Sequence, residues 1–598
     1  PRSHEFIYWL PGEVGFTGTS TSKSAKTPIE EVAMSNQNEN HYDVIIVGSG
    51  FGGSISALRL TEKGYKVLVI EAGARFKDTD FAKTSFNLKK FLFFPRLGLR
   101  GIQRIDLLKN VMVMSGAGVG GGSLVYANTL YRPPTTFFKT GSWAKMCDWE
   151  KELAPYYSQA ERMLGVEVNT YMSPADIELK KAADKLGYGD TFQMAPLGIH
   201  FGEPGKEVED PYFGGVGPSR TGCINCGECM TGCRHGAKNT LVKNYLYLAE
   251  QIGAEVVANT TVTDIIDSES GYEIRARHSS STGWVKKNVY TADQLIIAAG
   301  ALGSAKLLHK VRSKGHLQGI SSTLGSLSRT NSESLLGVVA KGKDIDFSLG
   351  SSITSSVFPN EHTHVEPVRY GKGSGFMGIM ESIMASGPKG QKPTVWRLIV
   401  ASIKKFGSLP SMYNLRTWPE RTLILLVMQS RDNSLTTFTK RGLLGRKLTS
   451  RQGYGEVNPA WVPEGHKLAR ELAEQFDGTA GAVVTEPFGI PMTAHFLGGS
   501  VIAPNAKEGV LDGYLRAFGQ PGLHILDGSA LSANPGVNPS LSIAAQAEWA
   551  CAFWPNKGET DTRPELGKEF KIIPPVKPIS PVVPKGAVGE LRLDVKIK

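Results

Sequence analysis

Short apolar runs that end at glycine recur along the chain. Residues 43–47 (DVIIV) and 66–70 (KVLVI) have the length of strands, and an amphipathic stretch of helical period separates them. Two further runs, within residues 293–310 and 522–550, are also followed by a glycine and then by a helical pattern. Continuous apolar runs of this length are typical of strands buried on both faces. The pattern predicts an α/β fold in which distant segments of the chain share one sheet.

A glycine-rich turn joins the first two apolar runs. Gly48, Gly50 and Gly53 fit the spacing G-x-G-x-x-G, which allows a tight turn, close approach to a pyrophosphate and close packing of helix on strand. The N-terminus of the following helix would offer its N–H groups and positive dipole end to phosphate. Glu71 ends the second run, where a carboxylate can accept hydrogen bonds from both ribose hydroxyls and would repel a 2′-phosphate. These features favour FAD or NAD over NADP.

Later segments favour FAD over NAD. The second glycine-rich stretch, MSGAGVGGGSLVYANTLY at 114–131, would let the backbone pack against a flat ring system. Asp527 and Gly528 end the last apolar run, and a helix is predicted to begin near Pro539. A helix N-terminus there could stabilise negative charge on a reduced flavin. Each run alone could be an ordinary core strand, but three of them spread over the chain favour a two-part FAD fold.

The two ends and the charge of the chain limit its possible roles. Residues 1–40 are polar and predicted to be a disordered, non-native leader, and the proline-rich residues 557–598 are predicted to be an extended tail. The net charge is +11, but the basic residues are scattered, which indicates a solvated surface rather than a nucleic-acid site. No apolar stretch approaches the roughly 20 residues that cross a bilayer, and no signal peptide stands at the start. We therefore expect a soluble, cytoplasmic protein, possibly peripheral at a membrane.

Four of the six cysteines fall in GCINCGECMTGCRHG, residues 222–236. They have the spacing C-x2-C-x2-C-x3-C: Cys223, Cys226, Cys229 and Cys233. In ferredoxins of this pattern the fourth cysteine serves another cluster, so here Cys233 would have to fold back, or Cys147 or Cys551 would have to replace it. A structural zinc site and metal-free thiols are the alternatives. Disulfides are disfavoured in a cytosolic protein.

These motifs together resemble the glucose-methanol-choline (GMC) oxidoreductases, in particular the branch of bacterial cholesterol oxidases. The resemblance runs from about residue 42 to 564, and its most specific parts are VGSGFGGS, GAGVGGGSL, GCRHGAKNTLVKNYL, RTNSES, AHFLGG and DGSALSANPGVNPSLSI. It implies a Rossmann-like FAD-binding domain assembled from residues 41–150, 235–311 and 490–556. It also implies an insertion at 151–234, which carries the cysteines, and an antiparallel-sheet substrate-binding domain at 312–489.

By this resemblance the active site lies over the flavin ring. His495 in TAHFLGGS matches the histidine that contacts the substrate hydroxyl, and Asn538 in GVNPS matches the asparagine beside the flavin. The resemblance also implies cofactor contacts for Val262, Gly122, Asn128 and Gly528, although Asn128 stands two residues later than the asparagine of the better-known members. The chemistry agrees, because an imidazole can take the hydroxyl proton near neutral pH and an amide can donate to a developing oxygen charge.

A sterol with a Δ5 double bond needs a further base, which moves a proton from C4 to C6 after oxidation. Residues 355–374 offer Glu361 and Glu366, and we prefer Glu366 because it lies in the alternating run THVEPVRY and best matches the glutamate of the family. In an apolar pocket the pKa of such a carboxyl would rise, which suits a group that accepts and returns a proton. The alternative is that both glutamates lie on a solvated strand face.

Two apolar stretches bear on membrane contact. Residues 88–104 mix aromatic and basic side chains and could either rest on a lipid surface or cover the cofactor, whereas residues 395–407 form a helical pattern with one apolar face, which indicates core packing. The leading hypothesis is FAD-dependent oxidation of a sterol 3β-hydroxyl, from cholesterol to cholest-4-en-3-one, with O2 or another electron acceptor. An electron-transfer flavoprotein with an iron-sulfur centre and a non-catalytic sterol-binding flavoprotein are the alternatives, and the intact His495 and Asn538 count against the last.

Overall fold

The computed structural model describes residues 40–282, 286–342, 344–387, 391–442 and 445–592. Almost all of the predicted leader at 1–40 lies outside these residues. Tyr42–Lys598 form one structural unit, and the segment that precedes them forms another. No helix in the described part of the chain is long and apolar enough to cross a bilayer.

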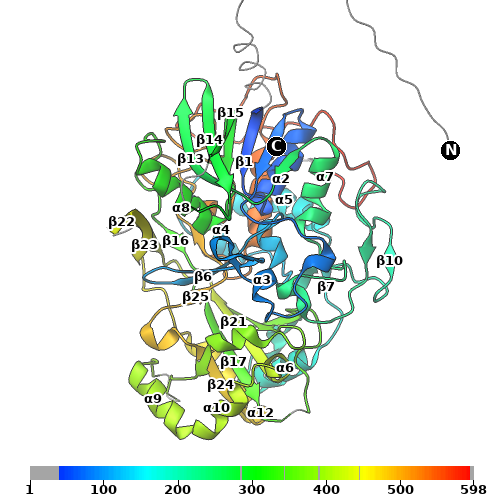
Figure 1. Ribbon diagram of the computed structural model, residues 1–598, viewed down its shortest axis with the longest axis vertical. Helices are drawn as coiled ribbons and strands as arrows, with labels where there is room; N and C mark the ends of the chain where they lie inside the picture. Colours follow the sequence, from blue (N-terminus) through cyan, green and yellow to red (C-terminus); the bar gives the residue numbers. More distant parts are fainter. Residues whose placement is uncertain (1–39, 283–285, 343, 388–390, 443–444, 593–598) are drawn as a thin grey trace, which may run out of the picture. The chain divides into compact units, whose positions relative to one another are not determined.

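Strands from three distant parts of the chain build the first sheet (Figure 1). These strands are β1 (His41–Val47), β2 (Val67–Ile70), β12 (Glu255–Val257), β13 (Thr260–Ser268), β14 (Gly271–His278), β15 (Asn288–Ile297) and β27 (Leu523–Ile525). β12, β2 and β1 pair in parallel, β27 pairs in parallel with β15, and β13, β14 and β15 pair antiparallel. The predicted assembly of the apolar runs into one sheet is therefore confirmed, because burial of both faces requires continuous apolar strands there.

Helices from equally distant segments pack against this sheet. They are α2 (Phe51–Glu62), α5 (Trp149–Met163), α7 (Tyr245–Gln251), α8 (Ala301–Arg312) and α13 (Ser540–Ala552). Arg59 of α2 forms a buried ion pair at 2.8 Å with Glu548 of α13, and the Tyr245 hydroxyl of α7 donates to the same glutamate at 2.6 Å. One buried network of charged and polar groups thus joins three helices, whose residues are up to about 490 positions apart in sequence.

A second sheet is antiparallel in every pair of its strands. Its order is β20 (Glu381–Ile383), β24 (Gly478–Val483), β17 (Ser334–Ala340), β21 (Thr422–Gln429), β19 (Thr363–Val368), β18 (Ser355–Asn360) and β8 (Gln193–Met194). α6 (Pro174–Leu186) and α12 (Pro463–Gln475) share an apolar cluster with one face of this sheet. Along β21, Leu423 and Leu425 belong to that cluster, whereas Ile424 and Leu426 face a large cavity. The two-residue period of a strand therefore separates the core face from the cavity face.

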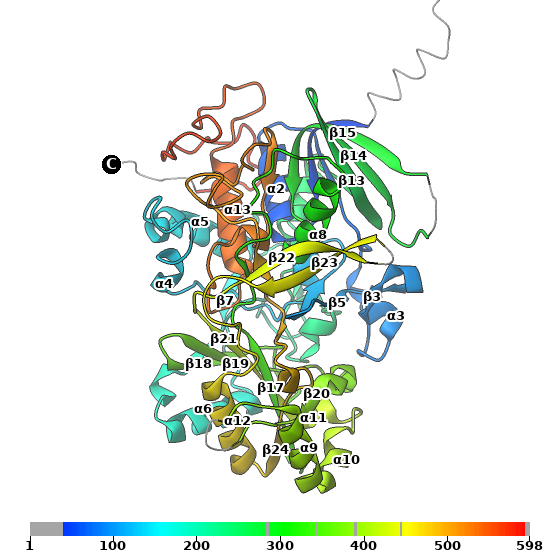
Figure 2. The same cartoon turned by 90° about the vertical axis from the view of Figure 1, so that its left-hand side faces the viewer.

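Smaller sheets lie between the two larger ones in both views (Figures 1 and 2). One contains β5 (Gln103–Leu107), β6 (Met112–Gly116) and β25 (Met492–Thr493), and the other contains β16 (Ser328–Arg329), β22 (Leu435–Gly442), β23 (Gly445–Gln452) and β26 (Leu497–Gly498). Because β16 pairs with β26, the segment RTNSES is brought beside the segment TAHFLGG. Residues 494–496 connect β25 to β26 at this point.

The remaining elements lie outside these sheets. They are α3 (Leu88–Phe91), β3 (Phe93–Phe94), β4 (Leu99–Arg100), α4 (Thr135–Phe138), β7 (Val166–Val168), β9 (Pro196–Gly198), β10 (Glu207–Val208), β11 (Arg220–Thr221), α9 (Val395–Lys404), α10 (Leu409–Met412) and α11 (Trp418–Arg421). Residues 557–592 contain no helix or strand, and the N–H groups of Val576 and Ser580 donate to the carbonyls of Ala552 and Glu62. The two-part organisation agrees with the fold class expected from the sequence, and the domain boundaries stay a prediction.

Candidate active site

A cavity of about 580 Å³ is lined by residues of both large sheets. From the first sheet and its loops it receives glycines, Glu71 and Asp527, and from the second it receives apolar side chains of β17, β19 and β21. One part of the wall is therefore rich in backbone groups, as a nucleotide requires, and another is apolar.

The three glycines of the first turn have two different roles. Gly48 has a φ of 103°, and a Cβ added to it would lie 2.4 Å from the carbonyl oxygen of Ala298. A Cβ on Gly53 would lie 2.0 Å from the carbonyl oxygen of Gly48, so α2 can pack on the turn only if this residue is glycine. A Cβ on Gly50 would meet no atom nearer than 4.0 Å, and Gly50 lines the cavity, whereas Gly53 does not. Gly48 and Gly53 thus serve packing, and Gly50 leaves room for a ligand.

Glu71 lies at the cavity wall and also holds the glycine-rich turn. Its Oε2 accepts hydrogen bonds from the Ser49 N–H at 3.1 Å and the Ser49 hydroxyl at 2.8 Å, and its Oε1 accepts one from the Gly73 N–H at 2.8 Å. The Gly118 N–H donates to the same Oε1 at 3.4 Å, so protein groups already use the about four acceptor sites of this carboxylate, and a ribose hydroxyl would have to displace this longest contact. The sequence predicts the ribose contact, but it does not indicate the bonds to the turn.

The second glycine-rich loop packs against the first. A Cβ on Gly121 would lie 2.6 Å from the Cα of Gly50, whereas a Cβ on Gly122 would meet only Phe51, at 3.9 Å. Gly122 lines the cavity, as expected of a cofactor contact. Asn128 does not: it is fully buried with a φ of 71°, and its neighbours Ala127 and Thr129 line the wall instead. The structure therefore does not bring Asn128 to the cavity.

Three more of the expected cofactor residues line the cavity. Val262 stands on β13, and Asp527 and Gly528 follow β27. The Ser529 N–H donates to Asp527 Oδ1 at 2.8 Å, and burial raises the pKa of this carboxyl. α13 begins at Ser540, whose position at the cavity agrees with the helix start predicted near Pro539. The open positions of Gly50 and Gly122, together with the N-termini of α2 and α13, fit a dinucleotide cofactor.

His495 lies at the cavity wall beside a buried carboxylate. Its Nδ1 is 3.0 Å from Oε2 of Glu333, which is fully buried. Glu333 also accepts hydrogen bonds from the Thr493 hydroxyl at 2.8 Å and the Ala494 N–H at 3.2 Å, so it is fixed to the backbone that carries the histidine. Because Nδ1 faces Glu333, the ring presents Nε2 for other contacts. Glu333 belongs to RTNSES, a motif that supports the family resemblance but to which the sequence assigns no role.

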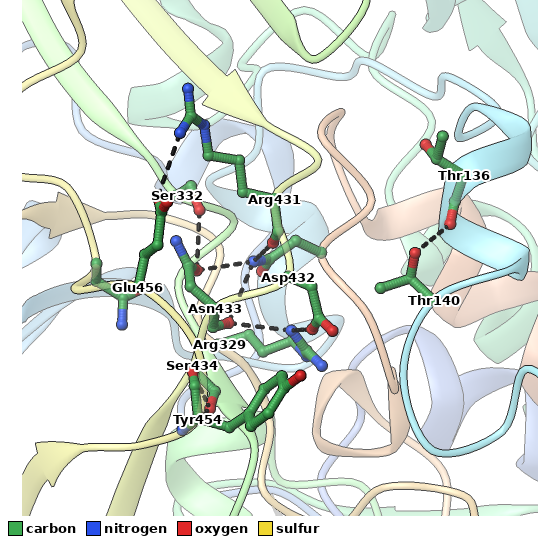
Figure 3. Close-up of polar contacts among 12 residues, drawn as sticks. Thr136, Thr140, Arg329, Ser332, Arg431, Asp432, Asn433, Ser434, Tyr454 and Glu456 are labelled. Atoms are coloured by element: carbon green, nitrogen blue, oxygen red, sulfur yellow. Dashed lines mark hydrogen bonds and ion pairs between the residues drawn. The ribbon is translucent and has the colours of Figure 1, made fainter.

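Polar contacts hold the RTNSES segment in place (Figure 3). Arg329 forms an ion pair with Asp432 at 2.8 Å, and the Ser332 hydroxyl donates to Asn433 Oδ1 at 3.0 Å. Ser332 has a φ of 44°, a conformation that non-glycine residues rarely adopt. The neighbouring loop at 431–434 therefore fixes the backbone turn from which Glu333 reaches His495.

The same segment also positions Asn538. Asn331 donates from Nδ2 to the Val537 carbonyl at 3.0 Å and accepts from the Gly536 N–H at 2.8 Å. Asn538 lines the cavity, and its Nδ2 donates to Glu366 Oε2 at 3.1 Å. His495, Asn538 and Glu366, predicted from three separate motifs, are thus connected through residues 331–333.

Glu366 is fully buried, and burial raises its pKa to about 8. It lies on β19 opposite Leu426 and shares a face with Val368, and both of these apolar residues line the cavity, whereas Glu366 lies behind the wall and contacts it through Asn538. Glu361 is 85% exposed and lies next to His362. The solvated strand face that we considered for both glutamates is therefore wrong for Glu366, and Glu361 lies not on a strand face but in the exposed turn between β18 and β19.

A third buried carboxyl stands in the apolar part of the cavity. Glu381 of β20 accepts a hydrogen bond from Trp418 Nε1 at 2.8 Å, and burial raises its pKa to about 7. The side chains around it are largely apolar: Val368, Tyr370, Met377, Met380, Trp418 and Leu426. The sequence analysis missed Glu381, although a single acidic residue within the apolar run FMGIMESIM could have indicated it.

Comparison with known proteins places this site in a family. The N-terminal model of the GMC oxidoreductases matches residues 35–196 and 216–313, and their C-terminal model matches residues 429–547. The chain belongs to the GMC oxidoreductases. The GMC chain is 54% identical to a cholesterol oxidase of Mycobacterium tuberculosis H37Rv over 92% of its own length and 97% of that protein. It is 42% identical to a cholesterol oxidase of Acinetobacter baumannii over 87% of its own length and 95% of that protein.

Solved structures agree with the fold of this GMC oxidoreductase. Pyridoxine 4-oxidase from Mesorbium loti superposes with a TM-score of 0.53 at 15% identity, over 85% of this chain and 98% of that one. An FAD-dependent oxidoreductase from Chaetomium thermophilum gives a TM-score of 0.52 at 15% identity, over the same shares of the two chains. At this identity the likeness concerns the fold alone.

The four clustered cysteines of the GMC chain lie outside the large cavity. All four line a second, small cavity, together with His235, Glu228 and Lys238. Cys147 and Cys551 do not line it, and Cys551 lies in α13 beside Ser56. The expectation that one of these two might replace Cys233 is therefore wrong, because the chain folds Cys233 back towards the other three.

Proposed function

We propose that this GMC protein is an FAD-dependent oxidase of sterol 3β-hydroxyl groups. The observation that carries the proposal is the position of His495, with its buried carboxylate partner, and of Asn538 in the wall of a cavity whose other part is apolar. The apolar wall suits a rigid hydrocarbon body, and the polar groups suit a single hydroxyl. Two relatives that align over most of the chain are named cholesterol oxidases.

Oxidation of a secondary alcohol removes a proton from oxygen and a hydride from carbon. Bound FAD would supply the hydride acceptor. His495 Nε2 accepts the hydroxyl proton, and the nearby Glu333 carboxylate stabilises the positive ring that results. Asn538 carries an amide beside this site and stays uncharged as charge develops on the substrate oxygen.

Isomerisation of the Δ5 double bond would follow with Glu366 as the base. The carboxylate would take a proton from C4 and return it at C6, with no net change in charge. Asn538 holds Oε2 of Glu366, which leaves Oε1 for the substrate. A pKa of about 8 makes this carboxyl basic enough to take a carbon-bound proton that is activated by the neighbouring ketone.

Anaerobic reduction of the flavin tests the proposal. Cholesterol should bleach the flavin absorbance, and readmission of air should restore it with release of hydrogen peroxide and of cholest-4-en-3-one. Bleaching without peroxide would contradict the oxidase assignment, and no bleaching by any 3β-hydroxysteroid would contradict the enzyme assignment. His495→Gln should abolish bleaching. The matched control is His466→Gln, which breaks a second buried His-Glu pair, 2.7 Å long, between His466 of α12 and Glu486, and it should bleach like the wild type.

The proposal includes transient contact with a membrane, and helix α9 supports it. The predicted core packing of residues 395–407 is wrong, because no residue of α9 is buried. Trp396, Ile403 and the following Phe406 are 72%, 71% and 72% exposed, and their spacing places them with Ile399 on one helical face. Residues 391–416 contain five basic side chains and no acidic one. An exposed apolar face with this charge fits the surface of an anionic bilayer.

The same helix is connected to the cavity. Ala401 of α9 and Leu409 of α10 pack on an apolar cluster that includes Tyr370, Met377 and Trp418, three residues of the cavity wall. Leu88 and Leu99 of the stretch 88–104 pack on this cluster too, while Leu97 at the tip of that stretch is 77% exposed. One part of residues 88–104 is therefore packed towards the cavity wall, and the exposed Leu97 supports the proposed contact with lipid. A sterol that leaves a bilayer under α9 would enter past this cluster.

Sedimentation with vesicles tests the membrane contact. The protein should sediment with phosphatidylcholine vesicles that contain phosphatidylglycerol, and the double variant W396A/I403A should remain in the supernatant. The matched control Y454A/V457A also removes two exposed apolar side chains, outside α9, and should sediment like the wild type. If the wild type oxidises detergent-dispersed sterol but does not sediment, the contact is refuted and the sterol oxidation stands.

A further inference from the structure

Four thiols converge on the small cavity, in a segment that is not part of the proposed alcohol chemistry. Cys223, Cys226, Cys229 and Cys233 all line this cavity of about 20 Å³. The chain wraps around it through left-handed turns at Asn225 (φ 55°), Gly227 (φ 70°) and Gly232 (φ 102°). The backbone N–H of Asn225 points at Cys223 Sγ, 3.5 Å away. Amide groups directed at cysteine sulfur are a feature of thiolate-ligated iron-sulfur sites, where such hydrogen bonds tune the potential.

Two buried cations near the thiols, Lys238 and Arg220, form no ion pair with a carboxylate in the described stretches of the chain. Lys238 lines the same cavity, is 2% exposed, and donates from Nζ only to the backbone carbonyls of Leu124, Tyr126 and Cys229, among the residues that the structure describes. Arg220 is 1% exposed and donates to the Ala237 carbonyl and to Asn239. Burial of an ammonium or guanidinium group is costly unless an anion lies close by. The cavity that Lys238 lines is therefore suited to an anionic group, such as thiolates that ligate a metal cluster.

The spacing of the donor atoms disfavours a single metal ion. A zinc ion with four thiolates at about 2.3 Å brings the sulfur atoms to about 3.8 Å from one another. Within the described ranges, the metal-binding side chains whose atoms gather within 4.8 Å as a group of three are Cys226, Glu228 and His235, not three of the cysteines. Arg234 already holds Glu228 through three contacts of 3.0 to 3.2 Å. The four cysteines line one cavity without three of them gathering within 4.8 Å, which a cluster with several iron atoms tolerates and a single ion does not.

We propose that Cys223, Cys226, Cys229 and Cys233 ligate one iron-sulfur cluster of the [4Fe-4S] type. A single cluster requires Cys233 to fold back towards the other three cysteines, and the structure meets this requirement because Cys233 lines the same cavity. The cluster would lie close to the cofactor cavity, since Met230, the residue after Cys229, lines that larger cavity. This centre is independent of the proposed oxidation of sterols, which needs no group from the cysteine segment.

Metal analysis of the full-length protein, purified without air, tests the proposal. We expect about four iron atoms and about four acid-labile sulfides per chain, and an electron paramagnetic resonance signal after reduction with dithionite. Iron and sulfide far below one per chain after anaerobic reconstitution with iron and sulfide would overturn the proposal. One zinc per chain in place of iron would overturn it as well.

Variants locate the cluster. Cys226→Ser and Cys229→Ser should lose iron and sulfide, while Cys147→Ser, which changes a half-buried thiol outside the cavity, should retain both. Flavin content and circular dichroism show whether each variant is folded. Equal loss of iron in Cys147→Ser and Cys226→Ser, with flavin retained in both, would show that the iron lies elsewhere and would refute the assignment.

Discussion

Replacement of Glu333 by glutamine should slow sterol oxidation strongly while the fold stays intact. Glutamine has the shape of glutamate and keeps one oxygen that can accept from Thr493 and Ala494, but it removes the charge 3.0 Å from His495 Nδ1. Close charge pairs of low solvent exposure couple by about 1.5 to 7 kcal/mol, and the lower part of this range, about 1.5 to 3 kcal/mol, applies here because His495 Nδ1 and Glu333 meet at ion-pair distance without hydrogen-bond geometry. A tenfold change in rate corresponds to about 1.4 kcal/mol, so kcat should fall about 10- to 150-fold.

Flavin reduction by cholesterol, followed in a stopped-flow instrument without air, measures this step directly. The loss should fall on kcat rather than KM, because the carboxylate acts on the histidine that takes the proton. Glu333→Asp keeps the charge and should recover part of the rate. Glu486→Gln breaks the corresponding contact to His466, outside the cavity, and should leave the rate unchanged.

The outcome that refutes this reasoning is specific. If Glu333→Gln binds flavin, unfolds at the wild-type temperature and reduces its flavin within threefold of the wild-type rate, Glu333 does not support proton transfer. A rise in KM at constant kcat would instead assign Glu333 to substrate binding.

Three further predictions follow from burial and packing. Glu366→Gln should release cholest-5-en-3-one in place of the conjugated ketone, and in the wild type the isomerisation rate should rise with pH through about 8, as the carboxylate forms. Folding raises the pKa of Glu366 from 4.5, so the native state binds this proton more tightly than the unfolded state does. The stability of the wild type should therefore fall as the pH rises from about 4.5 to about 8. Glu366→Gln should have a higher melting temperature than the wild type at pH 9 but not at pH 4. Gly50→Ala should fold but bind less FAD, whereas Gly53→Ala should be destabilised by about 1 to 3 kcal/mol in chemical unfolding, because its Cβ meets backbone at 2.0 Å. Glu381→Gln should raise the melting temperature above pH 7, and leave it unchanged at pH 4, without loss of flavin reduction.

The cofactor side of the site was largely predictable from the sequence. The roles of Gly48, Gly50 and Gly53 follow from local steric rules within one turn, and a turn of this kind carries its signal in consecutive residues. The join of β1, β15 and β27 was also visible, since each paired stretch is short, buried and largely apolar and is followed within a few residues by a glycine. Asn128 was placed by resemblance alone, and the structure leaves it away from the cavity.

The substrate side depends on contacts that no local pattern contains. Glu333 reaches His495 because β16 pairs with β26, and a pairing between residues about 170 positions apart has no signature in either segment. Helix α9 was mispredicted for a different reason. Its amphipathic period is clear in the sequence, but the period does not tell whether the apolar face packs in the core or lies on a lipid surface. The exposed side chains of Trp396 and Ile403 show that this face does not pack in the core. Under the proposed function this apolar face has a physical reason to remain uncovered, because a sterol is dissolved in lipid and the helix packs on the same cluster as the cavity wall.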